Sequence, residues 1–131
     1  MRDRNLEELR SFFSYHRTFN YPLAGEFSFA TRLARGINIA FDWGLEVSTL
    51  SEVHKRVTPQ KIAQIDLAPN YEYKHQDISP GDATRGLHRM VIDIAKFYLN
   101  HMRSHGFPLD DSVVDMILHS YYENALAFIK S

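Results

Sequence analysis

The sequence contains no cysteine, which excludes disulfide bonds, thiolate metal sites and cysteine nucleophiles. It also lacks any run close to the ~20 apolar residues that a membrane-spanning helix requires. The first residues are charged rather than apolar, and this excludes a secretory signal peptide at that position. From these absences we expect a protein of the cytoplasm that does not enter a membrane.

An excess of charge of one sign is absent as well. The formal net charge is −1 with histidine neutral, so we expect no broad attraction to nucleic acid or to an anionic membrane. Common catalytic signatures are also missing: no GxGxxG, GxxxxGK[ST], GxSxG or HExxH occurs, and no Asp-x-Asp pair that would hold a divalent cation on a nucleotide diphosphate.

What remains is a chain of 131 residues with 44% hydrophobic residues, a size and composition that predict one folded domain over residues 1–131. Apolar residues at helical spacing predict four to five helices, and the two longest fall at 87–102 and 113–129. Alternating apolar and polar residues predict two short strands, at 61–67 and 71–75. The expected fold class is therefore α+β and mostly helical.

A break rich in proline and glycine near residues 79–82 divides the chain. Residues 1–80 are rich in loops, whereas residues 81–131 read as a helical hairpin. Asp82 is a candidate N-cap for the first long helix, and Asp110 or Asp111 for the second.

Three glutamates lie in or beside loops flanked by aromatic residues, and two of them have a structural alternative. Glu26 follows a Pro-Leu-Ala-Gly loop that would offer backbone N–H groups to phosphate or sugar oxygens, or it simply complements a helix dipole. Glu46 follows Trp43 and Gly44, which would form a pocket wall; alternatively Asp42 caps a helix and Trp43 packs in the core. Glu72 lies in the second expected strand.

The histidines carry little evidence for a metal site. His75 stands alone, whereas a protein site needs about three ligands. His101 and His105 have zinc-compatible spacing, but no acidic residue lies between them. We interpret this pair as cations at a helix C-terminus, and the other isolated histidines as structural.

Three pieces in order are more specific than any of them alone: PLAGEF at 22–27, WGLEV at 43–47, and IAQIDL at 62–67 followed by EYKHQ at 72–76. Together they resemble the C-terminal part of the glucosyl-3-phosphoglycerate synthases. Those enzymes are retaining glycosyltransferases with a GT-A fold that use nucleotide-sugar donors. The resemblance covers about residues 6–78, and the last two helices fit it only in general character.

The resemblance implies roles for individual residues. Leu23, Ala24, Gly25 and Glu26 would approach the donor nucleotide-sugar, and Glu46 would be the catalytic residue that points at the reacting sugar. Glu72 and His75 would approach the metal and the phosphoglycerate acceptor. Tyr73 stands where the family often has a metal-binding histidine, and His75 is the nearest substitute, two residues further on.

The nucleotide-binding α/β sheet and the Asp-x-Asp motif of that family are absent from this sequence. We therefore expect a glycosyltransferase-like C-terminal domain that is not catalytic alone, has no cofactor of its own, and uses Mg²⁺ or Mn²⁺ only when a nucleotide-sugar-binding domain completes it. One alternative is a stand-alone interaction module on the same scaffold. Another is a small enzyme that uses Glu46, Glu72 and His75 in a new way.

The last helix carries an apolar stripe wider than one neighbouring helix can cover. Covering such a stripe usually requires a partner, and two-fold pairing is the commonest solution. We therefore expect a homodimer formed through the two C-terminal helices, as the family resemblance also implies. The alternative is a monomer in which the N-terminal helix covers the stripe.

Overall fold

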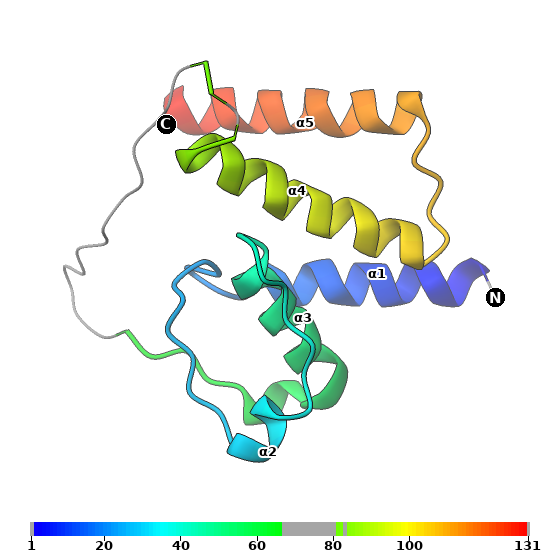
Figure 1. The fold of residues 1–131 in the computed structure, drawn as a ribbon. Coiled ribbons are helices and arrows are strands. Elements are labelled where there is room, and N and C mark those ends of the chain that lie inside the picture. Colours follow the sequence, from blue (N-terminus) through cyan, green and yellow to red (C-terminus); the bar gives the residue numbers. More distant parts are fainter. Residues whose placement is uncertain (1, 67–80, 83, 131) are drawn as a thin grey trace.

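The computed structural model describes residues 2–66, 81–82 and 84–130. Over these residues the chain forms α-helices joined by loops and one 3₁₀ turn (Figure 1). The elements are α1 (Arg2–His16), α2 (Thr31–Ala34), α3 (Leu45–Arg56), η1 (Pro59–Lys61), α4 (Gly86–Ser104) and α5 (Asp111–Lys130). Both long helices expected from the C-terminal pattern are present, and Asp110 accepts a hydrogen bond from the backbone N–H of Val113 at 3.0 Å, as expected of an N-cap.

The expected α+β class is wrong, because the described part of the chain is helical and contains no strand. Residues 61–66 begin in η1 and continue without regular structure. Their alternation buries no face, since Ile65 remains 79% exposed. The segment is held by a side chain instead: Gln64 donates to the carbonyl of Thr18 at 2.6 Å and accepts from the N–H of Asn20 at 2.8 Å. Leu67 and the second expected strand, 71–75, lie outside the described residues.

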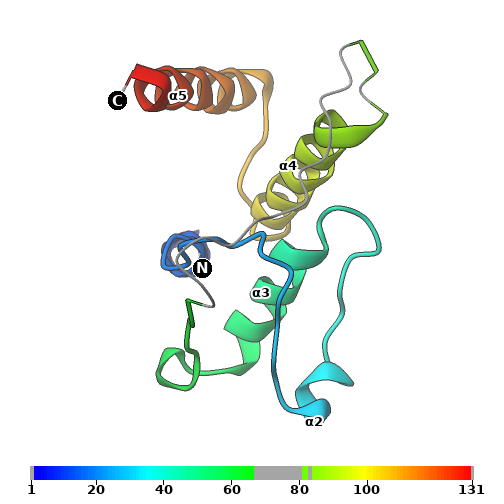
Figure 2. The same cartoon turned by 90° about the vertical axis from the view of Figure 1, so that its left-hand side faces the viewer.

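The buried apolar core is small and lies between α1 and α3. Its members from α1 are Leu9, Phe12 and Tyr15, and α3 contributes Val47 and Leu50. Helix α1 packs on α3, and α3 packs on α4 (Figure 2). Phe12 is 2% exposed and is the centre of this core.

Helix α3 also buries polar groups, and these fix the loop that precedes it. The Ser48 hydroxyl accepts from the N–H of Ala40 at 2.8 Å and donates to the carbonyl of Leu45. The Glu52 carboxylate accepts from the N–H of Asn38 at 3.0 Å and pairs with Arg56 at 2.6 Å. Burial works against ionisation of Glu52, but the Asn38 N–H and the neighbouring Lys55 and Arg56 cations outweigh it and lower its pKa.

Helix α5 stands apart from the rest of the described chain. In the view of Figure 1, α5 appears beside α4, but the view turned by 90° in Figure 2 shows the two helices apart. None of its side chains is fully buried, so neither α4 nor α1 covers the apolar stripe completely. None of the helices described is both long and apolar enough to cross a membrane.

Candidate functional site

The first part of the candidate site is the loop at residues 22–26, between α1 and α2. Gly25 has a φ of +77°, a backbone conformation that favours glycine, and the N–H of Ala24 donates to the carbonyl of Tyr21 at 3.2 Å. Leu23 and Ala24 are half-buried, whereas Gly25 and Glu26 are exposed. The alternative in which Glu26 complements a helix dipole is wrong, because α2 begins only at Thr31.

The second part is the start of α3, where Glu46 occupies the first turn. Gly44 is the N-cap, and the Asp42 carboxylate accepts from the N–H of Gly44 at 2.9 Å in a turn just before the helix. Asp42 therefore stabilises the helix entry without being the cap itself. Trp43 is 37% exposed, so it does not pack in the core as the alternative required. Glu46 is half-buried.

The fold brings these two parts together. A Cβ atom built on Gly25 would lie 3.7 Å from Oε1 of Glu46, so the carboxylate lies close to the loop on the side where a side chain at Gly25 would project. With no side chain at Gly25, a ligand can approach both the loop backbone and the carboxylate. The arrangement suits a polar ligand that needs a negative charge beside it.

Helix α4 supports this site from behind. A Cβ atom on Gly44 would lie 3.7 Å from Cβ of Phe97 and 3.0 Å from Oδ1 of Asp42, so the entry to α3 is packed closely against α4. One turn earlier on α4, buried Asp93 pairs with Arg89 at 2.8 Å. The sequence analysis missed Asp93, because an acidic residue four places from an arginine on a helix is usually an exposed charge.

The acceptor-side residues cannot be placed, since Glu72, Tyr73 and His75 lie outside the described residues. Within the described ranges, no group of three or more His, Asp or Glu side chains is arranged to hold a metal ion. We therefore assign no step to a metal bound by these residues.

Two curated proteins match the sequence. One from Persephonella marina is 39% identical over 114 residues, which is 87% of this chain, and one from Methanococcoides burtonii is 40% identical over 108 residues, or 82% of the chain. Both are named glucosyl-3-phosphoglycerate synthase. The chain is a relative of the C-terminal part of these synthases.

The expected resemblance to the glucosyl-3-phosphoglycerate synthases is thus confirmed. The chain spans only about a quarter of the length of these relatives, 28% of the first and 26% of the second. No protein-family model and no solved structure matches it.

The similarity to the glucosyl-3-phosphoglycerate synthases did not lead us to expect a cluster of histidines around Phe12. The His101 ring stacks on Phe12 with centroids 3.9 Å apart, and the His16 ring lies 4.3 Å from Phe12. Nδ1 of His16 is 2.9 Å from the hydroxyl of Tyr98, which joins α1 to α4. The Phe12 and His54 rings meet in a T-shaped arrangement with centroids 6.2 Å apart.

These histidines are neutral near pH 7. Burial, with His54 and His101 nearby, lowers the pKa of His16 to about 4. Burial, with His105 and Lys55 nearby, lowers the pKa of His101 to about 4. The interpretation of His101 as a cation at the helix end is therefore wrong, because its ring is packed against an aromatic residue. We assign the cluster to the packing of α1, α3 and α4.

Proposed function

We propose that this chain supplies the C-terminal part of a glucosyl-transfer site, as in the relatives named glucosyl-3-phosphoglycerate synthase, and that a nucleotide-sugar-binding domain completes the site. The proximity of Glu46 to the loop at Gly25 carries this proposal. The two segments were singled out separately in the sequence, and the fold places them side by side. Identity of 39–40% over most of this chain supports the same assignment.

A carboxylate in this position suits transfer of a sugar. Positive charge develops on the ring of a glycosyl group as its bond to the leaving group breaks. A fixed carboxylate beside that ring stabilises the charge without reorganising. Glu46 is held for this role by its position in the first turn of α3.

In this proposal the isolated chain is not catalytic. Orientation of the donor contributes a large share of such a rate enhancement, and the described residues offer only one side of a site. A divalent ion would be bound with the nucleotide-sugar by the completing domain. A cytoplasmic location remains part of the proposal.

Self-association is the second function that we propose, in the form of a homodimer through the C-terminal helices. The exposed apolar face of α5 favours it: Leu118 is 59% exposed, Tyr121 68% and Tyr122 59%. Apolar groups gathered on one helix in this way usually meet a partner.

A reconstitution assay tests the first proposal. Radiolabelled transfer from UDP- or GDP-glucose to 3-phosphoglycerate is measured with Mg²⁺ present, first with this chain alone. It is then repeated after adding the part of the P. marina relative that this chain does not match. We expect no turnover by either piece and measurable turnover by the mixture. Turnover by this chain alone, abolished by Glu46→Ala, would contradict the proposal that a second domain is needed.

A further inference from the structure

Large apolar side chains stand exposed around the start of α3, next to the loop at Gly25. Phe41 is fully exposed, at 101%, and Ile39 is 51% exposed. Phe27 and Phe29 are each 38% exposed, and their ring centroids lie 6.4 Å apart. Soluble proteins usually cover a group of exposed apolar side chains against another surface, so these four residues indicate an interaction surface.

Hydrogen bonds hold the loop at 38–42 beside the first turns of α3. The N–H of Ala40 donates to Oγ of Ser48 at 2.8 Å, and the N–H of Asn38 donates to the Glu52 carboxylate at 3.0 Å. The backbone of this loop is therefore fixed before any partner binds. Because little of it has to be ordered on association, its exposed apolar side chains suit a docking surface.

These side chains also lie close to the candidate site. Phe27 follows Gly25 by two residues, so their Cα atoms are at most about 8 Å apart, and Gly25 lies close to the Glu46 carboxylate. In the loop that precedes α3, the Cβ atom of Ala40 lies 3.5 Å from the position of a Cβ atom built on Gly44. Both segments that border Glu46 therefore carry exposed apolar groups.

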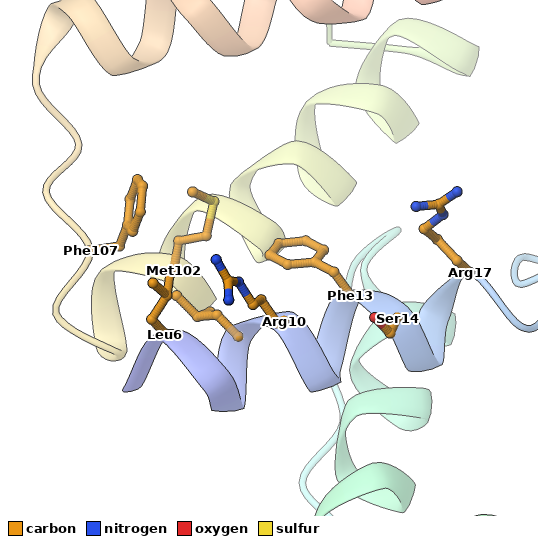
Figure 3. Close-up of a pocket in the computed structure, with 8 residues that line it drawn as sticks. Leu6, Arg10, Phe13, Ser14, Arg17, Met102 and Phe107 are labelled. Atoms are coloured by element: carbon orange, nitrogen blue, oxygen red, sulfur yellow. The ribbon is translucent and has the colours of Figure 1, made fainter. Parts of the chain in front are cut away.

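The other apolar features of the described chain lie elsewhere. A groove of about 320 Å³ is lined by residues of α1, of α4 and of the connection after α4, among them Leu6, Phe13, Met102 and Phe107 (Figure 3). Helix α5 and helix α2, which begins two residues after Phe29, lie at opposite ends of the described chain in both views (Figure 1 and Figure 2). Neither the groove nor α5 covers the surface at the start of α3.

We propose that Phe27, Phe29, Ile39 and Phe41 form the surface on which the nucleotide-sugar-binding domain docks, through an apolar patch of that domain. The chain spans 28% and 26% of its two relatives, so most of each relative lies outside the match. A domain that delivers a donor sugar to Glu46 has to meet this chain beside Glu46, where these side chains are exposed. Aromatic residues at the centre of an interface usually carry much of its binding energy. This inference rests on the glucosyl-transfer site proposed above and specifies the surface that holds its second half.

Thiol labelling tests the position of this surface, because the chain has no cysteine of its own. Phe41→Cys is introduced into this chain alone and into a chimera in which this chain replaces the matching segment of the P. marina relative, with any cysteine of the added part changed to serine. We expect the maleimide labelling rate of the introduced thiol to fall at least about tenfold in the chimera, because a buried group reacts only through local opening. Ile39→Cys, on the same loop, should show the same protection. Ser120→Cys, an exposed position on α5, is the matched control and should react equally fast in both.

Binding of the separate pieces measures what the Phe41 ring contributes. Phe41→Ala should raise the dissociation constant of this chain for the unmatched part of the P. marina relative at least about tenfold, measured by isothermal titration calorimetry. Because Phe41 is fully exposed, urea unfolding of the isolated variant should match that of the wild type. Ile129→Ala, at a position 78% exposed on α5, is the matched control and should leave the dissociation constant unchanged.

Two results would overturn the proposal: equal affinity of the Phe41→Ala variant and the wild type, or equal labelling of the Phe41→Cys thiol in the isolated chain and in a folded chimera. Either result with an active chimera would leave the glucosyl-transfer site standing and refute only the docking surface. A protected thiol in a folded chimera that transfers no glucose would support the docking surface and refute the transfer site, so the two proposals fail separately.

Discussion

Lowering the pH from 7.5 to 5 should destabilise this chain through His16, which is 6% exposed and packed against Phe12. Its pKa falls from 6.5 to about 4 on folding, mainly because burial disfavours the charged ring. Between these two values the unfolded chain binds a proton that the folded chain does not. Stability is therefore complete above pH 6.5 and is lost as the pH falls toward 4.

The size of the effect follows from the two pKa values. At pH 5 the unfolded ring is almost fully protonated and the folded ring almost fully neutral, so His16 alone accounts for a loss of about 2 kcal/mol. His101 shifts in the same direction, but it is only half-buried and water screens part of its effect, so it adds less. In a small domain such a loss is a large fraction of the total free energy of unfolding.

Urea unfolding followed by far-ultraviolet circular dichroism at pH 7.5, 6 and 5 measures this loss. In the His16→Gln variant most of the dependence should disappear, with about 2 kcal/mol less change than in the wild type. His119→Gln, on an exposed position of α5, is the matched control and should behave as the wild type. If the wild type and His16→Gln lose the same free energy between pH 7.5 and 5, the assignment of the effect to the buried ring is wrong.

Three further changes have defined outcomes. Gly25→Ala places a side chain on a residue with a φ of +77° and should lower the free energy of unfolding in urea by about 1 kcal/mol. Gly36→Ala should cost less, because the backbone at Gly36 has no positive φ. Tyr15→Phe removes a buried hydroxyl that has no partner among the described residues, so it should leave the free energy of unfolding unchanged or raise it. Tyr98→Phe removes the hydroxyl that contacts His16 and should lower the free energy of unfolding by about 1 kcal/mol. Calorimetry with Mg²⁺ or Mn²⁺ should detect no micromolar binding to the isolated chain, because Mg²⁺ needs several carboxylate or phosphate oxygens; micromolar affinity without nucleotide would contradict this.

The helical part of the fold could be predicted from the sequence because its signals are local. Apolar spacing, Gly106 and the Asp110 cap determine where α4 ends and where α5 begins. The prediction of a strand at 61–67 was wrong because a strand depends on contacts that are not local. A strand requires a neighbour for its backbone hydrogen bonds, and alternation in one segment does not show whether such a neighbour exists.

The candidate site was predictable in part. Gly25 and Glu46 were chosen from separate segments, but their proximity depends on tertiary packing that no local pattern contains. His16 and His54 were correctly interpreted as structural. His101 was not, because its burial against Phe12 depends on the meeting of α1 with α4. Glu52 and Asp93 gave no signal, since an acidic residue four places from an arginine on a helix is ordinary on a surface.

The central claim is that Glu46 and the Gly25 loop form one side of a glucosyl-transfer site. A chimera tests it most directly, in which this chain replaces the matching segment of the P. marina relative. We expect the chimera to transfer glucose to 3-phosphoglycerate, and Glu46→Gln to lower kcat by about 100-fold, the loss typical of removing one group that stabilises developing charge. Glu123→Gln, an exposed position on α5, should leave kcat unchanged. A folded, active chimera whose kcat is the same with Glu46→Gln would contradict the account.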